Sequence, residues 1–190
     1  RLIPGSPISK KYQQPLETGD HPKLDVSAFF NEDDIEVYQL MIGSMQWAVS
    51  IGQMDIQTAV MSMSSFREQP RIGHLSRLHR MIGYLAKFQD FKIRFCVDPP
   101  DYSSVPDISE QYWKYTPYGV CSEDLLLDAP EPKGKPITLT HYFNANLMHD
   151  VLSGKAVTGT IHFWNKTPMD WFSKKQSTSE TATYGSKFLA

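Results

Sequence analysis

The hydrophobic pattern divides the chain into parts of different character. Residues 1–31 are rich in proline, glycine and short polar residues without a sustained period, which indicates an irregular N-terminal segment. From Ile35 onwards, apolar residues recur every three or four positions in three successive stretches, which predicts three amphipathic helices packed as a small bundle. Their apolar faces are Ile35, Tyr38, Ile42, Met45 and Val49, then Ile56, Ala59, Val60, Met63 and Phe66, then Leu75, Leu78, Ile82, Leu85 and Phe88.

Polar residues and proline predict where these helices begin and end. Asn31 or Asp33 is a suitable N-cap for the first helix and Asp55 for the second, because their side chains accept hydrogen bonds from free backbone N–H groups. Pro70 is expected to end the second helix, since proline disfavours helical geometry in the residue before it. The third helix is expected over roughly 72–90.

The rest of the chain contains short alternating runs, which are typical of strands. "FKIRFCV" at 91–97 predicts one strand, and the stretch 98–136, rich in proline and acidic residues, predicts an irregular connection with a short hairpin near "YWKYTPYGV". Further strands are expected at 137–147, 156–164 and 168–173, before a helix that begins near Thr178. The predicted fold class is α+β, with an irregular segment 1–31, a helical bundle 32–97, a connection 98–136 and a three-stranded antiparallel sheet plus one helix over 137–190.

Composition adds limits to this picture. The 190 residues carry a net charge of −2, so any affinity for nucleic acid must come from local charge. Only Cys96 and Cys121 are present, which excludes a disulfide framework and a cysteine-rich zinc module. The N-terminus has no signal-peptide core and no apolar run reaches the roughly 18 residues of a membrane span. We expect an intracellular location, cytoplasmic or nuclear, for a piece of a longer chain that does not start with methionine.

The third predicted helix carries a basic stripe opposite its leucine face. Between residues 67 and 94 there are seven Lys or Arg against two Asp or Glu, a local excess of five. A stripe at this spacing can follow the phosphates of a nucleic acid, and the alternative is an ordinary solvated helix face. Its members are Arg71, His74, Arg77, Arg80 and Lys87, with Tyr84 on the same face.

Lys174, Lys175 and Gln176 follow the last predicted strand and precede a helix. A basic pair beside a helix N-terminus suits a phosphate, which makes this corner a second candidate contact; the alternative is an ordinary strand exit. The histidines His141, His149 and His162 fall on or near neighbouring strands. Without carboxylate or cysteine partners they are expected to be core or surface residues, and no metal ligand set is predicted.

Five motifs together resemble one known family. "YQLMIGSMQWAVSIGQMDIQTAVMSMSSF", "GHLSRLHRMIGYLAKF", "LTHYFNANLMHD", "AVTGTIHFWNKTPMDWFSKKQ" and "ETATYGSKFLA" resemble, in this order, the Pol polyprotein of copia-type LTR retrotransposons, over roughly residues 20–190. The resemblance implies that the helices belong to the thumb and connection of a reverse transcriptase, which grips the template–primer duplex. The strands would then begin a ribonuclease H domain, and the polymerase palm would lie upstream.

The same resemblance identifies two degenerate catalytic positions. Ribonuclease H holds two Mg²⁺ ions with carboxylates, and the family's first-strand aspartate and first-helix glutamate correspond to Asn144 and Lys187 here. We therefore expect no intact catalytic residue and no Mg²⁺ binding. A register slip at the helix would instead bring in Glu180, whereas Asp150 and Asp170 fall on no catalytic position of the pattern.

Three functional hypotheses follow from the resemblance. The first is an inactive fragment of a reverse transcriptase and ribonuclease H polyprotein that keeps weak, sequence-independent binding to an RNA–DNA hybrid or DNA duplex. The second is a part of a longer, active RNA-directed DNA polymerase with ribonuclease H. The third is an interaction scaffold that self-associates through an open sheet edge or uncovered apolar face. Whether the chain belongs to an active enzyme stays open at this stage.

Overall fold

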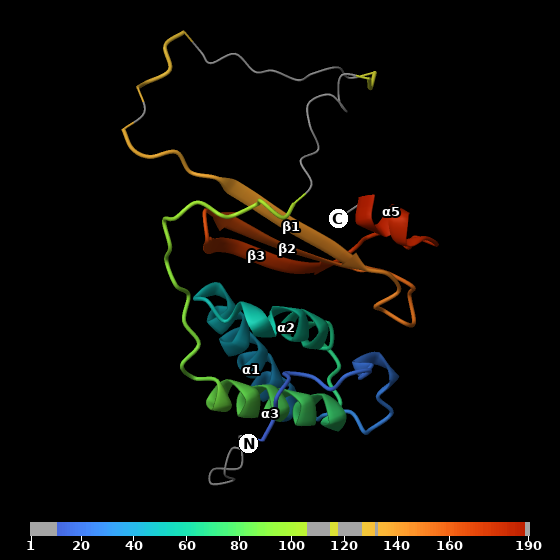
Figure 1. The fold of residues 1–190 in the computed structure, drawn as a ribbon. Coiled ribbons are helices and arrows are strands. Elements are labelled where there is room, and N and C mark those ends of the chain that lie inside the picture. The colour runs from blue at the N-terminus through green and yellow to red at the C-terminus, as the bar shows by residue number, and fades with distance from the viewer. Residues whose placement is uncertain (1–10, 106–114, 118–126, 132, 189–190) are drawn as a thin grey trace.

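A computed structural model describes residues 11–105, 115–117, 127–131 and 133–188 of the protein. Within them the helices α1–α3 form a layer beneath a three-stranded sheet, and α5 lies on the other side of that sheet (Figure 1). The predicted α+β class, with an antiparallel three-stranded sheet and a following helix, is confirmed. The elements are η1 (Pro22–Leu24), α1 (Glu32–Ser50), η2 (Met54–Ile56), α2 (Gln57–Ser64), α3 (Ile72–Lys87), β1 (Leu139–Asn146), β2 (Val157–Trp164), β3 (Thr167–Lys175) and α5 (Thr183–Phe188).

The helix boundaries confirm one predicted cap and correct another. Asn31 caps α1, since its side-chain oxygen accepts a hydrogen bond from the Asp34 backbone N–H at 2.9 Å. Asp55 does not cap the second helix, because the chain first passes through η2 and α2 begins after Ile56 without a side-chain cap. The Asp55 carboxylate instead accepts a hydrogen bond from the Tyr84 hydroxyl at 2.6 Å and so ties η2 to α3.

The main apolar core lies among α1, α2 and α3, as the apolar spacing predicted. Tyr38 is fully buried in it, and its hydroxyl donates to the Met63 carbonyl at 2.8 Å, so that the polar group is satisfied inside the core. Burying each large aliphatic side chain contributes about 1.5–3 kcal/mol. The fully buried large side chains of this core are Tyr38, Ile42, Ile56, Met63, Leu78 and Met81.

The sheet has the order β1-β2-β3 with antiparallel neighbours, and the three predicted strands are confirmed. Side chains alternate between its two faces. One face lies on the helical layer, where the Trp171 indole N–H donates to the Val49 carbonyl at 3.1 Å. The other face carries Ala145 and its partner Thr158, and α5 packs against β1 there.

Residues 91–97 do not form the predicted strand. Their extended backbone joins no ladder in the described structure; instead, side chains near the β2–β3 turn bind it. The Cys96 backbone N–H donates to Thr167 Oγ1 at 2.7 Å, and Asn165 Nδ2 donates to the Val97 carbonyl at 2.7 Å. These bonds fix the end of a segment that crosses from the helical layer to the sheet.

Two further predictions concern the ends of the sheet region. The predicted hairpin near "YWKYTPYGV" lies largely outside the described residues. The last helix begins at Thr183 and not near Thr178. The intervening Ser and Thr residues compete with helical hydrogen bonding, and Ser179 Oγ donates to the Ser153 carbonyl at 2.8 Å instead. Among the described residues, no helix is both long and apolar enough to cross a membrane.

Candidate functional site

The predicted basic stripe of α3 is covered by residues 11–31, here called the N-terminal strap. Arg77 makes the strongest contact: its Nε and Nη2 donate to the two carboxylate oxygens of Asp20, each at 2.7 Å. Its Nη1 donates to Asp25 at 2.5 Å. The hydrogen bonds that Arg77 donates to Asp20 and Asp25, together with their two negative charges, raise the pKa of Arg77 more than burial lowers it.

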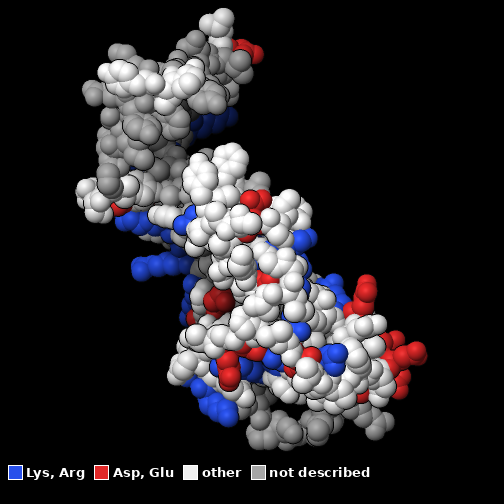
Figure 2. All heavy atoms as spheres, turned by 90° about the vertical axis from the view of Figure 1, so that its right-hand side faces the viewer, with Lys and Arg blue, Asp and Glu red and all other residues white. Residues whose placement is uncertain are grey.

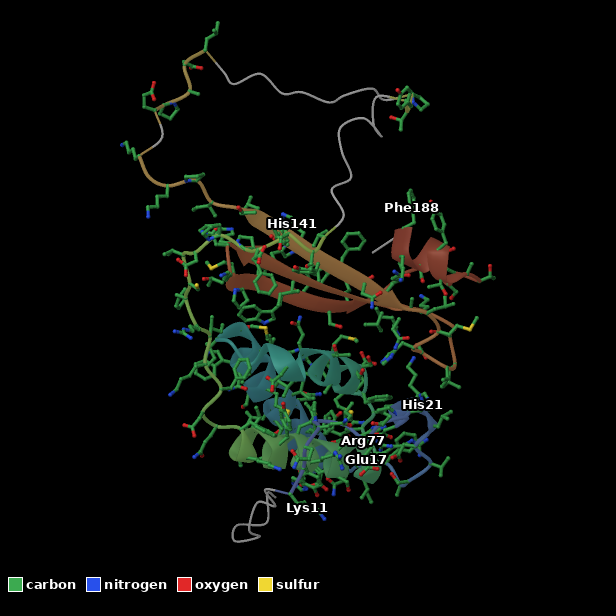
Figure 3. All side chains as sticks on the ribbon, in the orientation of Figure 1. Lys11, Glu17, His21, Arg77, His141 and Phe188 are labelled. Atoms are coloured by element: carbon green, nitrogen blue, oxygen red, sulfur yellow. The ribbon has the colours of Figure 1, made fainter. Side chains whose placement is uncertain are left out.

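Arg71 and Arg80 also face the N-terminal strap. Arg71 Nη1 donates to the Ser27 carbonyl at 2.5 Å, and its guanidinium lies 3.7 Å from the centre of the Phe29 ring. Arg80 Nη1 donates to Glu17 at 2.6 Å, and Figure 3 shows Glu17 beside α3. Three arginines of the predicted phosphate-contacting stripe are thus engaged within the protein.

His74 is a core residue, with 2 % of its surface exposed. Its Nδ1 accepts from the Arg71 backbone N–H at 3.0 Å, so the proton lies on Nε2, which donates to the Pro22 carbonyl at 3.0 Å. The ring stacks on Phe66 at a centroid distance of 4.0 Å. Burial lowers the pKa of His74 more than the Pro22 bond and Asp25 raise it, so the ring is held neutral.

The open stripe expected from the sequence is therefore corrected to a covered one, because the N-terminal strap supplies the opposite charges. Of its members, Lys87 has no ion pair among the described residues and lies over the Phe88 ring at 5.4 Å. The signal that sequence reasoning missed is the group Glu17, Asp20 and Asp25, in a segment to which no chemistry had been assigned. Figure 2 agrees: on the face it shows, acidic and basic side chains lie interspersed over the helical layer.

The second candidate contact, Lys174–Gln176, is divided between the two faces of the sheet. Lys174 is exposed on the face that carries α5. Lys175 lies on the opposite face and pairs with Asp150 at 3.3 Å. Gln176 is buried, and its Nε2 donates to Thr158 Oγ1 at 2.9 Å and to the Ser186 carbonyl at 2.7 Å, which holds α5 on the sheet.

The degenerate nuclease positions Asn144 and Lys187 are not brought together. Alternation along β1 places Asn144 on the opposite face from Ala145, the residue beside α5, whereas Lys187 is exposed on α5 itself. The Asn144 side-chain oxygen accepts a bond from the Ala145 backbone N–H at 3.0 Å. An amide and an ammonium on different faces do not fit Mg²⁺, which prefers carboxylate oxygens.

The other residues weighed as metal ligands also form no such group. His141 and His162 contact each other through their Nδ1 atoms across β1 and β2, with ring centroids 4.6 Å apart. Asp170 and Glu180 add no third ligand. In the described part of the chain, no group of three or more His, Cys, Asp or Glu is placed to hold a metal ion.

Asp150 is the one acidic residue of the turn between β1 and β2, and it is closely surrounded by hydrogen-bond donors. Its side chain is 3 % exposed, pairs with both Lys23 and Lys175, and accepts from Ser153 Oγ at 2.5 Å. Burial raises the pKa of Asp150, but these hydrogen bonds outweigh it and hold the pKa well below the usual range. Asp150 is thus an ionised link between the N-terminal strap, this turn and β3.

Comparisons with protein-family models, with curated proteins and with solved structures find no match to this chain.

Proposed function

We propose that this chain is part of the Pol polyprotein of a copia-type LTR retrotransposon, namely the reverse-transcriptase thumb and connection followed by the first part of ribonuclease H. The observation that carries the proposal is the order of elements: a three-helix layer, then the antiparallel sheet β1-β2-β3, then a helix that returns against β1. This is the order that the sequence motifs imply. The separate hypothesis of a longer, active polymerase is tested by reading the flanking coding sequence for a palm with paired aspartates.

In this proposal the chain has no ribonuclease H activity of its own. Two-metal hydrolysis needs anionic ligands on both sides of the scissile phosphate. Asn144 supplies a neutral amide and Lys187 a positive charge, and the two lie on different faces of the sheet. Cleavage of an RNA–DNA hybrid by the unmodified chain with magnesium, abolished by a chelator, would contradict this.

The proposed remaining role is weak electrostatic contact with a nucleic-acid duplex. The arginines of α3 are paired with the N-terminal strap. The cations that contact the duplex are therefore ones without an ion pair among the described residues. Among the cations that meet this condition, Lys87, Lys92 and Arg94 lie close together in sequence, and Lys166, whose charge acts on the exposed Asp101, lies near them. They follow the segment that rises from the end of α3 to the β2–β3 turn (Figure 1), where Cys96 binds Thr167.

Fluorescence anisotropy with an RNA–DNA hybrid and a DNA duplex tests this contact. We expect binding at low salt that weakens as salt rises, because each neutralised phosphate releases counterions. Changing Lys92, Arg94 and Lys166 to Gln should lower the slope of log affinity against log salt by about 2 to 3. The matched control changes Lys174 and Lys187, exposed cations elsewhere on the molecule, to Gln. No binding at low salt, or binding indifferent to salt, would contradict the proposal.

A second candidate function, self-association, is favoured by one observation. The sheet face away from the helical layer keeps large apolar side chains exposed: Leu139 at 58 %, Phe143 at 64 % and Trp164 at 51 %. Leu139 and Trp164 are directly paired across β1 and β2, and exposed apolar side chains gathered on one sheet face are typical of an interaction surface. Sedimentation should show a concentration-dependent dimer that Phe143→Ser weakens, and a strictly monomeric chain would remove this candidate.

A further inference from the structure

A cavity of about 530 Å³ lies between the N-terminal strap, α2 and the turn after β1. No part of the proposed nucleic-acid contact uses it. Its volume falls within the range of about 300–1,000 Å³ that is usual for small-molecule sites. Figure 3 shows His21 on the strap, directly beneath that turn, on the side where the cavity lies. Three segments distant in sequence therefore form one half-open space with both polar and apolar walls.

One end of the cavity carries two ammonium groups, whereas Glu17 and Asp20, which also line the cavity, are paired with Arg80 and Arg77. Lys23 and Lys175 both pair with the same oxygen of Asp150, so two ammonium groups share a single carboxylate and leave a formal charge of one. Each ammonium has three donors, of which Asp150 takes one. The excess charge and the remaining donors suit an anion with several oxygens, such as a phosphate.

His149 adds a donor at the same end. Its Nδ1 accepts from Asn146 Nδ2 at 3.2 Å, which leaves the proton on Nε2 and that nitrogen without a partner among the described residues. Burial lowers the pKa of His149, and the nearby His21 lowers it further, so the ring is neutral at neutral pH. A bound phosphate would accept a hydrogen bond from Nε2–H and favour protonation of the ring.

The other end of the cavity presents an unpaired acceptor beside an apolar wall. Asp55 Oδ2 is held by the Tyr84 hydroxyl, whereas its Oδ1 is buried and has no hydrogen-bond partner in the described structure. A buried, unpaired carboxylate oxygen is costly unless a donor reaches it. Ala59 on α2, one helical turn after Asp55, also lines the cavity and offers an apolar surface for a flat ring.

We propose that this cavity binds a small phosphorylated ring compound of nucleotide size. The phosphate lies at Lys23, Lys175 and His149, and an N–H group of the ring donates to Asp55 Oδ1 while the ring packs on Ala59. The proposal is independent of duplex binding, because none of these residues is among the cations proposed to contact a duplex, Lys87, Lys92, Arg94 and Lys166.

Isothermal titration of the full chain with three probes tests the site. Adenosine monophosphate offers both ends, ribose 5-phosphate only the phosphate, and adenosine only the ring. We expect the monophosphate to bind at least about tenfold more tightly than either half, since it alone engages both ends. No saturable binding of the monophosphate up to about 5 mM, which is the affinity expected of a very weak contact, would overturn the proposal.

Substitutions test which residues bind the phosphate of the ligand and which bind its ring. Lys175→Gln should weaken the binding of adenosine monophosphate and of ribose 5-phosphate about tenfold and leave the binding of adenosine unchanged. Asp55→Asn should weaken the binding of adenosine monophosphate and of adenosine, but not that of ribose 5-phosphate. Lys174→Gln is the matched control, because this neighbour lies on the other face of β3. Equal losses in Lys174→Gln and Lys175→Gln would overturn the assignment. If a variant unfolds, as judged by circular dichroism, the comparison of the three probes on the unchanged chain still decides.

Discussion

At the scale of single residues, two arginines on α3 show how solvent exposure determines the contribution of an ion pair to stability. Arg77 meets Asp20 and Asp25, whose side chains are 17 % and 9 % exposed. Arg80 meets Glu17, whose side chain is 70 % exposed. Solvent screens the second pair, so it contributes little to stability, whereas loss of the first leaves two partly buried carboxylates without their donor.

We therefore expect Arg77→Met to destabilise the protein by about 1–3 kcal/mol, because it orphans three hydrogen bonds at two carboxylates. Arg80→Met, three residues further along the same helix, should cost no more than about 1 kcal/mol. Urea denaturation followed by circular dichroism measures both. Equal losses of unfolding free energy in the two variants would show that burial of the acids does not determine how much each ion pair stabilises the protein.

At the scale of elements, the helices could be predicted from the sequence because the residues that determine each helix lie close together along the chain. The spacing of Tyr38, Ile42 and Met45 fixes the buried face of α1, and the Asn31 cap lies directly before it. Residues 91–97 alternate like a strand but have no ladder partner in the described structure, and that partner is a property of the whole fold. The covering of α3 escaped prediction for the same reason: Arg77 and Asp20 are 57 residues apart in sequence.

The attachment of α5 depends on one buried side chain. Gln176 joins the end of β3 to Thr158 on β2 and to the Ser186 carbonyl on α5. Gln176→Met keeps the size of the side chain but removes both donors, so we expect faster amide exchange over 183–188 with little change in α1. Hydrogen exchange with mass spectrometry measures this. Lys174→Met, two residues earlier and exposed, is the control, and unchanged exchange of α5 in the Gln176 variant would contradict the expectation.

At the scale of the whole molecule, the N-terminal strap connects the two layers through ionised acids. Asp25 binds Arg77 on the helical layer, and Asp150 binds Lys23 of the strap and Lys175 of the sheet. Burial raises the pKa of Asp25, but hydrogen bonds from Ser27 and Arg77 outweigh it and lower the pKa from 3.8 to about 2. The pKa of Asp150 is lowered as well. Both acids are therefore more acidic in the folded than in the unfolded chain.

A folded-state pKa below the unfolded value gives stability that is complete above the unfolded pKa and lost as the pH falls through the folded one. We expect the urea midpoint to be constant near neutral pH and to fall as the pH drops from about 4 to about 2. Asp25→Asn should lower the midpoint at pH 7 and flatten this fall, because Asn cannot titrate. Asp33→Asn, exposed at the start of α1, is the control and should keep the wild-type profile. If the Asp25→Asn and wild-type profiles ran parallel, the titration of Asp25 would not be a cause of the loss of stability in acid.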